Sequence, residues 1–252
     1  MKFKSVPYLL TLTTLLFLAF ASTAKAESWK KIAGCGKDIG VGRNRSAWVL
    51  GCASGGNGGN EIYRWNGTAW QRVDGAATNI AVAPDGTPWV VAADGTIWNR
   101  KGSSWQQVPG CGKDIGVGNN DSAWVLGCAS GGNGGYEIYR WNSTAWQRVD
   151  GAAIRIAVSP EGIPWVVAAD GTIWNRKGNS WQQVPGCGKD IGVGTDDSAW
   201  VLGCASGGNG GNEIYRWNDN AWEKVDGAAS RIAVSPGGIP WVVSSDGTIW
   251  KR

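Results

Sequence analysis

Three Trp-Asn dipeptides carry the clearest binding chemistry in this sequence. They recur at intervals of 76 residues as Trp65-Asn66, Trp141-Asn142 and Trp217-Asn218. Each Trp follows a Tyr by two positions, so both rings lie on one face if the segment is a strand. An exposed indole stacks on the apolar C–H face of a sugar, while an adjacent amide hydrogen-bonds hydroxyl or acetamido groups. The same indole could instead pack at the edge of a sheet, and the sequence leaves both interpretations open.

Segments rich in glycine and asparagine form a second candidate site. They span 54–60, 130–136 and 206–212, with Asn57, Asn133 and Asn209 at their centres. Glycine lets backbone amides approach a ligand closely, and the asparagine amides can donate or accept hydrogen bonds. The alternative is a flexible connection that binds no ligand.

No motif indicates catalysis or a cofactor. The chain has no His, no G-x-S-x-G motif, and no carboxylate pair that differs from its repeat copies. The variable positions, such as 43–45 and 195–197, fall in expected turns. The Asp-Gly-Thr-Ile-Trp runs are similar to the aspartate box of sialidase propellers, but their spacing differs. We therefore expect a binding protein that is not an enzyme and holds no cofactor.

The six cysteines are expected to form three disulfides. Runs at 38–41 and 47–50 suggest a hairpin around a turn at 43–45, in which opposed residue numbers sum to about 87. The sum for Cys35 and Cys52 is also 87. Of 15 possible pairings, repetition and this register favour Cys35–Cys52, Cys111–Cys128 and Cys187–Cys204. A thiolate metal site is the alternative, which the absence of His and of C-x-x-C spacing disfavours.

Residues 1–26 have the pattern of a secretory signal peptide. Lys2 and Lys4 precede an apolar run at 8–21, and Ala24-Lys25-Ala26 is an A-x-A cleavage site. The run is short for a membrane span, so we expect cleavage after Ala26 and no membrane insertion. The remaining 27–252 would be one domain, secreted or periplasmic, where disulfides persist.

Charge and composition exclude some partners. Residues 1–26 hold three of the 24 lysines and arginines and none of the 20 acidic residues, which leaves 21 basic and 20 acidic residues. This balance predicts binding neither to nucleic acid nor to an anionic membrane. The same 26 residues contain all three Phe and the single Met, whereas all 18 Trp lie beyond them. Tryptophan must therefore supply much of the core.

The repeats predict an all-β, six-bladed β-propeller. Each 76-residue unit divides into two related halves with four short strand-like runs, and turn signals such as Pro84-Asp85-Gly86 separate the runs. The six modules are marked by Ile39, Ile80, Ile115, Ile156, Ile191 and Ile232. Residues 28–32 match the fourth run at 104–108 but have no blade before them. We expect this N-terminal strand to complete the sixth blade and close the ring, which removes open sheet edges.

The other tryptophans and one charged pair fit structural roles. Trp48, Trp89 and their repeats lie in apolar runs that would be buried between blades. Trp29, Trp70, Trp105 and their repeats lie on fourth strands and are expected to pack. Lys37-Asp38 and its repeats suggest a structural ion pair or a turn hydrogen bond rather than a site.

The pattern W-x-x-I-x-G…I-x-V-G-x-x-x-x-x-W-V-L…I-Y-R resembles the tectonin repeat. Here it comprises Trp29, Ile32, Gly34, Ile39, Val41, Gly42, Trp48, Ile62, Tyr63 and Arg64. The second halves carry a degenerate version with Trp89, Ile97 and Trp98. The resemblance covers nearly all of 27–252 and implies a propeller lectin, as in the tachylectin and fish-egg-lectin group. It implies binding to lipopolysaccharide, N-acetylated sugars or methylated glycans at repeated sites.

Two function classes remain. The first is a monomeric, multivalent lectin for glycans on microbial or other cell surfaces, in which repeated weak sites gain avidity. The second is a non-catalytic propeller scaffold that binds proteins and has no sugar site. Near-identity of the three units favours the lectin, although duplication alone produces the same similarity.

Overall fold

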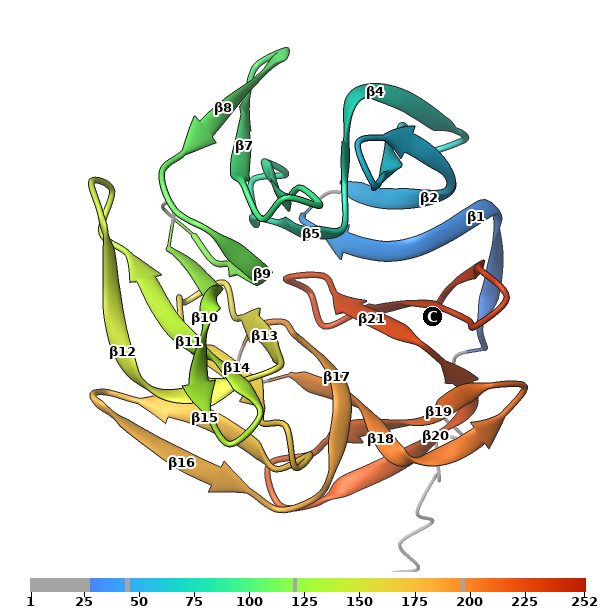
Figure 1. Ribbon diagram of the computed structural model, residues 1–252. Coiled ribbons are helices and arrows are strands. Elements are labelled where there is room, and N and C mark those ends of the chain that lie inside the picture. Colours follow the sequence, from blue (N-terminus) through green and yellow to red (C-terminus); the bar gives the residue numbers. More distant parts are fainter. Residues whose placement is uncertain (1–27, 44–45, 120–121, 196–197) are drawn as a thin grey trace, which may run out of the picture.

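The strands form six blades around a central axis (Figure 1). The computed structural model describes residues 28–43, 46–119, 122–195 and 198–252, and in these it contains 23 β-strands. The predicted signal peptide and parts of the variable turns at 43–45 and 195–197 lie outside the described residues. In the rest, the all-β, six-bladed architecture predicted from the repeats is confirmed.

Each blade is an antiparallel sheet of four strands, which are consecutive in blades 1 to 5, whereas the N-terminal strand supplies the fourth strand of blade 6. Blades 1 and 2 contain β1 (Lys30–Val41), β2 (Ala47–Gly56), β3 (Gly59–Trp65), β4 (Trp70–Ala77), β5 (Asn79–Val82), β6 (Pro88–Val91), β7 (Ile97–Lys101) and β8 (Ser104–Val108). Blades 3 and 4 contain β9 (Gly112–Val117), β10 (Ala123–Gly132), β11 (Gly135–Trp141), β12 (Trp146–Ala153), β13 (Arg155–Val158), β14 (Pro164–Val167), β15 (Ile173–Lys177) and β16 (Ser180–Val184). Blades 5 and 6 contain β17 (Gly188–Val193), β18 (Ala199–Gly208), β19 (Gly211–Trp217), β20 (Trp222–Ala229), β21 (Arg231–Val234), β22 (Pro240–Val243) and β23 (Thr248–Lys251).

The ring closes through β1, which serves two blades. Its first residues pair with β23, with Lys31 opposite Trp250 and Ile32 opposite Ile249, and its later residues pair with β2. A single seven-stranded sheet therefore joins blades 6 and 1, and the blue β1 strand runs beside the red strands of blade 6 (Figure 1). The predicted closure by an N-terminal strand is confirmed, so β23 is not left as an open edge.

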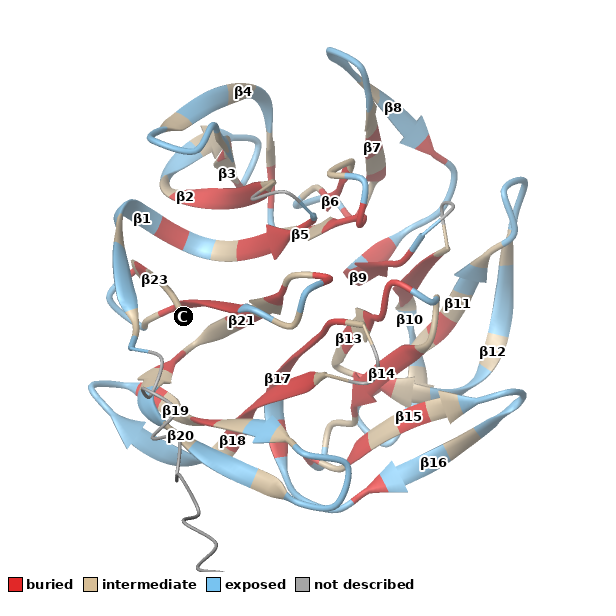
Figure 2. Ribbon diagram, turned by 180° about the vertical axis from the view of Figure 1, so that it is seen from behind, coloured by how far each residue is buried: buried red, intermediate tan, exposed pale blue. Residues whose placement is uncertain are grey.

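Burial falls from the axis outward (Figure 2). The second strands are apolar on both faces because a neighbouring blade covers each of them, as the fully buried run Pro88–Val91 shows. Fourth strands such as β4 and β16 are mostly exposed. Consistent with prediction, Trp48 and Trp89 are 3% and 1% exposed.

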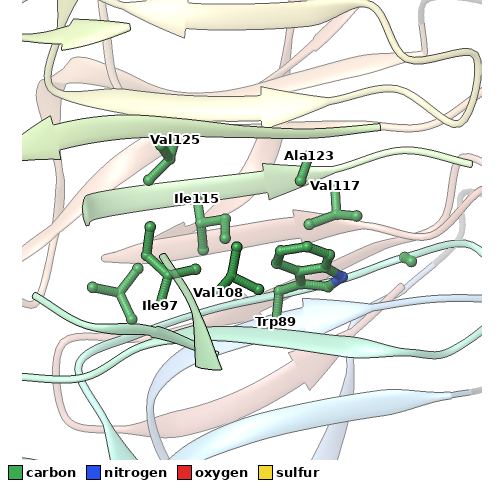
Figure 3. Close-up of a cluster of buried hydrophobic side chains, with 9 residues drawn as sticks. Trp89, Ile97, Val108, Ile115, Val117, Ala123 and Val125 are labelled. Carbon is green, nitrogen blue, oxygen red and sulfur yellow. The ribbon is translucent and has the colours of Figure 1, made fainter. Parts of the chain in front are cut away.

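Blades pack face to face through interlocking apolar side chains (Figure 3). Between blades 2 and 3, Trp89, Ile97 and Val108 lie against Ile115, Val117 and Val125. Five further clusters of this kind fill the gaps between the other neighbouring blades of the described chain. Removing a core Trp from such a gap is expected to cost about 3–5 kcal/mol of stability.

The three predicted disulfides are present, although the hairpin register differs by one. Cys35–Cys52, Cys111–Cys128 and Cys187–Cys204 are bonded, each with its Cα atoms 5.5 Å apart. Opposed residues such as Ile39 and Val49 sum to 88, not the expected 87. A register shift between Gly36 and Asp38 restores 87 at the Gly36–Gly51 pair, beside the cysteines. A β-bulge thus aligns cysteines that regular pairing would leave offset.

Candidate functional site

Three pockets recur once per 76-residue unit, each between the two blades of that unit. They lie between blades 1 and 2, blades 3 and 4, and blades 5 and 6, with volumes of about 460, 340 and 460 Å³. We call them pockets 1/2, 3/4 and 5/6. These volumes fall in the range of small-molecule sites, about 300–1,000 Å³.

Half-buried tryptophans line each pocket. In pocket 1/2 they are Trp98 on β7 and Trp105 on β8, and the other copies are Trp174 and Trp181, and Trp250 and Trp29. Trp105 Nε1 donates to the Asp74 carbonyl at 2.9 Å, and the Arg100 guanidinium lies 5.1 Å from its ring centroid. Its indole is therefore held rigidly at the pocket wall. Because the sequence suggested only packing or degenerate motif roles, these tryptophans were missed as site residues.

The turn between β6 and β7 supplies a carboxylate to pocket 1/2. Asp94 Oδ1 accepts hydrogen bonds from the Thr96 backbone N–H at 2.9 Å and from the Thr96 hydroxyl at 2.7 Å. The backbone hydrogen bond, followed by the hydroxyl, lowers the pKa of Asp94. The group is ionised at neutral pH and can accept hydrogen bonds from a ligand. Asp170 and Asp246 repeat this arrangement.

The glycine- and asparagine-rich segment forms a tight hairpin at the mouth of the pocket. β2 extends to Gly56 and β3 begins at Gly59, which leaves only Asn57 and Gly58 as the turn. Both have positive φ, 49° and 78°, as a type I′ turn requires. Asn57, Asn133 and Asn209 each line a pocket, so the structure brings this predicted set together with the tryptophans.

Pocket 5/6 differs from the other two in the turn between β22 and β23. Ser244 and Ser245 replace the pairs Ala92-Ala93 and Ala168-Ala169. The Ser245 hydroxyl donates to the Asn209 carbonyl, which ties the hairpin to the facing turn. This pocket is therefore more polar than its copies.

The predicted Trp65 set lies at the other end of β3. Trp65 is half-buried and packs against the cluster between blades 6 and 1, with its ring centroid 5.0 Å from that of Trp70. Arg100 occupies the equivalent place opposite Trp105. The Trp-to-Arg alternation thus preserves a contact with a fourth-strand indole, as a tilted aromatic pair in one half and a cation–π contact in the other. Trp65, Trp141 and Trp217 do not line the three pockets described above.

Asn66 holds the turn that follows Trp65. Its Oδ1 accepts from the Ala69 N–H at 2.8 Å, and from the Thr68 N–H at 2.9 Å and hydroxyl at 3.0 Å. Asn142 and Asn218 make the corresponding bonds to Ala145 and Ala221. This carbonyl oxygen is therefore engaged within the turn.

The central channel is narrow and carries a ring of polar side chains. Its volume is about 90 Å³, too small for a sugar site. Asp38, Asp114 and Asp190 alternate there with Asn79, Arg155 and Arg231, one residue per blade. The Arg155 and Arg231 Nε atoms lie 3.5 Å from Asp190 and 3.6 Å from Asp38. The expected structural role of Asp38 is seen, but its ion-pair partner is Arg231 of blade 6, not Lys37.

Burial in this ring raises the carboxyl pKa values. Desolvation, only partly offset by Arg231, raises the pKa of Asp38 to about 7. Desolvation likewise raises the pKa of Asp114 to about 6, with Arg155 opposing it. The Asp38 and Asp114 carboxylates also accept the Ile80 and Ile156 N–H groups at 2.9 Å. These contacts give the ring a structural role in joining successive blades.

The described residues include no group of three or more His, Cys, Asp or Glu side chains placed to hold a metal ion. They also include no helix long and apolar enough to cross a membrane.

The sequence is similar to a known family and to one curated protein. The Tectonin domain family model matches residues 50–133 and 126–206. Tectonin-2 of Physarum polycephalum is 35% identical over 68 residues, which is 27% of this chain and 18% of that protein. The alignment therefore spans less than a fifth of that relative's length.

Several solved structures share the fold at low identity. Streptogramin B lyase is 14% identical with a TM-score of 0.58, and the alignment covers 89% of this chain and 96% of the lyase. YCF48 bound to a D1 peptide is 14% identical with a TM-score of 0.54, covering 85% and 76% of the two chains. A Bacteroides thetaiotaomicron protein of unknown function is 8% identical with a TM-score of 0.59, covering 89% and 71%. At these identities, the likeness concerns the fold alone.

Proposed function

This chain belongs to the tectonin domain family, and on that premise we propose that it is a multivalent lectin whose sugar sites are pockets 1/2, 3/4 and 5/6. The family is of the lectin-like propeller type, which supports carbohydrate binding in general. The observation that carries the proposal is that each unit repeats a pocket lined by two tryptophans, one asparagine and one aspartate.

Each pocket combines the two features that a sugar requires. Trp98 and Trp105 provide flat apolar surface for the C–H face of a pyranose ring, and the Ala93 methyl group lies on the same wall. Asn57 and the ionised Asp94 provide directional hydrogen-bonding groups for hydroxyl or acetamido substituents. N-acetylated or methylated sugars suit this mixture because they carry apolar methyl groups beside polar ones.

The chemistry of the pocket favours binding over catalysis. Glycoside hydrolysis ordinarily needs a pair of carboxyl groups, one of them protonated, whereas the described lining of pocket 1/2 carries the single carboxyl group of Asp94, whose lowered pKa keeps it charged. We propose that the protein is not an enzyme and holds its ligand without transforming it.

Three equivalent sites on one monomer would act together on a repetitive glycan surface. Weak individual sites then gain avidity, because the second and third contacts are intramolecular. We propose secretion or export of 27–252 after removal of 1–26, to act on glycans of microbial or other cells. Three disulfides in the chain support an oxidising compartment.

A second candidate site is the Trp65 set with Asn66, Asn142 and Asn218. The half-burial of Trp65 and its presence in each unit favour it, since part of the indole remains available to a ligand. Asn57 and Asn66 lie at opposite ends of the seven-residue strand β3, about 20 Å apart. The two sets are therefore separate sites and can be tested separately.

The deciding experiment compares two triple variants on a glycan array and by calorimetry with N-acetylglucosamine. Replacing Asn57, Asn133 and Asn209 by Gly removes the amides while keeping the positive-φ turns, and should abolish binding. The matched variant replaces Trp65, Trp141 and Trp217 by Ala and should keep three sites if it folds. The opposite result would move the site to the Trp65 set. A wild-type protein that binds no glycan on the array would instead favour the protein-binding scaffold.

A further inference from the structure

Each pocket rests on the disulfide of the next unit. The turn Asp94-Gly95-Thr96 of pocket 1/2 packs directly on Cys111–Cys128, which joins the residue before β9 to β10 of blade 3. A Cβ atom on Gly95 would lie 2.6 Å from Cys111 Sγ and 3.0 Å from Cys128 Sγ. The φ of Gly95 is +89°. Contact this close leaves room only for glycine.

A backbone hydrogen bond also links the same turn to blade 3. The Gly112 N–H, beside Cys111, donates to the Gly95 carbonyl at 2.8 Å. The turn thus meets both the disulfide and the first strand of the following blade.

The arrangement recurs in all three copies. A Cβ on Gly171 would lie 2.6 Å from Cys187 Sγ, and one on Gly247 would lie 2.5 Å from Cys35 Sγ. The corresponding backbone bonds, from Gly188 to Gly171 and from Gly36 to Gly247, are 2.8 and 2.9 Å. In the third copy, Gly247 of blade 6 contacts the Cys35–Cys52 disulfide of blade 1, at the junction where the ring closes.

The turn formed by Asp94, Gly95 and Thr96 also orients two side chains that line pocket 1/2. Asp94 is held by Thr96, and the Thr96 hydroxyl also accepts a hydrogen bond from Trp98 Nε1 at 2.9 Å. Displacement of Gly95 would therefore shift a carboxylate and an indole that both line pocket 1/2. A continuous set of contacts leads from the disulfide through Gly95 and Thr96 to Trp98.

We propose that each disulfide is a positioning element for the pocket of the preceding unit, not only a staple within its own blade. Cys111–Cys128 positions pocket 1/2, Cys187–Cys204 positions pocket 3/4, and Cys35–Cys52 positions pocket 5/6. The part of this inference that concerns ligand affinity rests on the proposed lectin function.

The test uses two matched variants of the full chain. One replaces Cys111 and Cys128 by Ser, and the other replaces Cys187 and Cys204 by Ser. Each loses one equivalent disulfide, so a general loss of stability affects both alike. Hydrogen–deuterium exchange is followed in peptides spanning 94–105 and 170–181. Their masses differ because Ser103 in the first corresponds to Asn179 in the second.

The first variant should lose protection in 94–105 but keep it in 170–181, and the second should do the reverse. In each variant, calorimetry with N-acetylglucosamine should show two binding sites in place of three. Gly95→Ala, which keeps all six cysteines, should reproduce the first variant, because its Cβ displaces the same turn.

Two outcomes separate this inference from the proposed function. Loss of protection confined to the unit that lost its disulfide, with three sites retained, would overturn the inference. A wild-type protein that binds no sugar would overturn the lectin proposal, while the exchange pattern would still decide whether the disulfide positions the neighbouring turn.

Discussion

The side-chain amide of Asn79 donates a hydrogen bond of 3.2 Å to Asp114 in the central channel. At the equivalent positions, Arg155 lies beside Asp190 and Arg231 beside Asp38. The ring therefore contains three aspartates but only two arginines. Among the described residues Asp114 therefore forms a hydrogen bond with Asn79 where its two copies form salt bridges, which breaks the threefold repeat at the centre of the molecule.

Asn79→Arg should stabilise the propeller above pH 7. The new guanidinium would complete the third ion pair and lower the pKa of Asp114, which burial raises to about 6. We expect the free energy of unfolding in urea at pH 8 to rise by about 1–2 kcal/mol. Asn79→Gln, which adds length without charge, is the control. Equal stability of the Arg and Gln variants would contradict the ion-pair argument.

Stability should decrease as pH rises from 5 to 7.5. The pKa of Asp38 is about 7 in the folded protein but about 3.9 when unfolded, so the folded state retains a proton that the unfolded state releases. This contribution is complete below pH 4 and is lost as pH approaches 7. We expect a decrease on the order of 1–3 kcal/mol, measured by urea unfolding at several pH values.

Asp38→Asn should reduce the slope of that profile and leave the smaller part that Asp114 contributes, because burial raises the pKa of Asp114 to about 6. Asp94, Asp170 and Asp246 provide an internal contrast, because hydrogen bonds from their neighbouring threonines lower their pKa values. Their effect on stability is lost only as pH falls below about 4. An unchanged slope between pH 5 and 7.5 in the Asn variant would assign the dependence to other groups.

Deleting residues 28–33 should open the ring. The deletion removes three of the four residues of β1 that pair with β23, and also Trp29, whose Nε1 donates to the Asp226 carbonyl at 2.8 Å. We expect the melting temperature to fall by roughly 10 °C or more and the protein to associate through the exposed edge. Trp105→Ala removes an equivalent indole without opening the ring and should cost less. Light scattering that shows a monomer with unchanged melting would disprove the importance of closure.

Asn66→Ala should weaken a turn without changing sugar binding. Its Oδ1 accepts hydrogen bonds from Thr68 and Ala69, so the loss should be about 0.5–1.5 kcal/mol. Calorimetric stoichiometry should remain that of the wild type. If the folded variant loses one site, the Trp65 set is the binding site and the pockets are not.

The fold could be predicted from the sequence because its signals are local and repeated. The 76-residue period, the turn residues and the unpaired match between 28–32 and 104–108 determine the number of blades and their closure. The pairing of Cys35 with Cys52 followed from a hairpin only a few residues long. Even the one-residue register error was harmless there, because a bulge near Gly36 absorbs it.

The candidate site depended on contacts between blades, which no local pattern encodes. Asn57 was identified from its glycine-rich surroundings. Trp98 and Trp105 resemble packing residues in the sequence, and only the packing of blade 1 against blade 2 shows that they line a pocket. The proximity of Asn79 to Asp114, and of Gly95 to Cys111, likewise follows from neighbouring blades meeting around the axis. Sequence repetition determines which elements form, but the angle and spacing at which closed blades pack decide which side chains share a pocket.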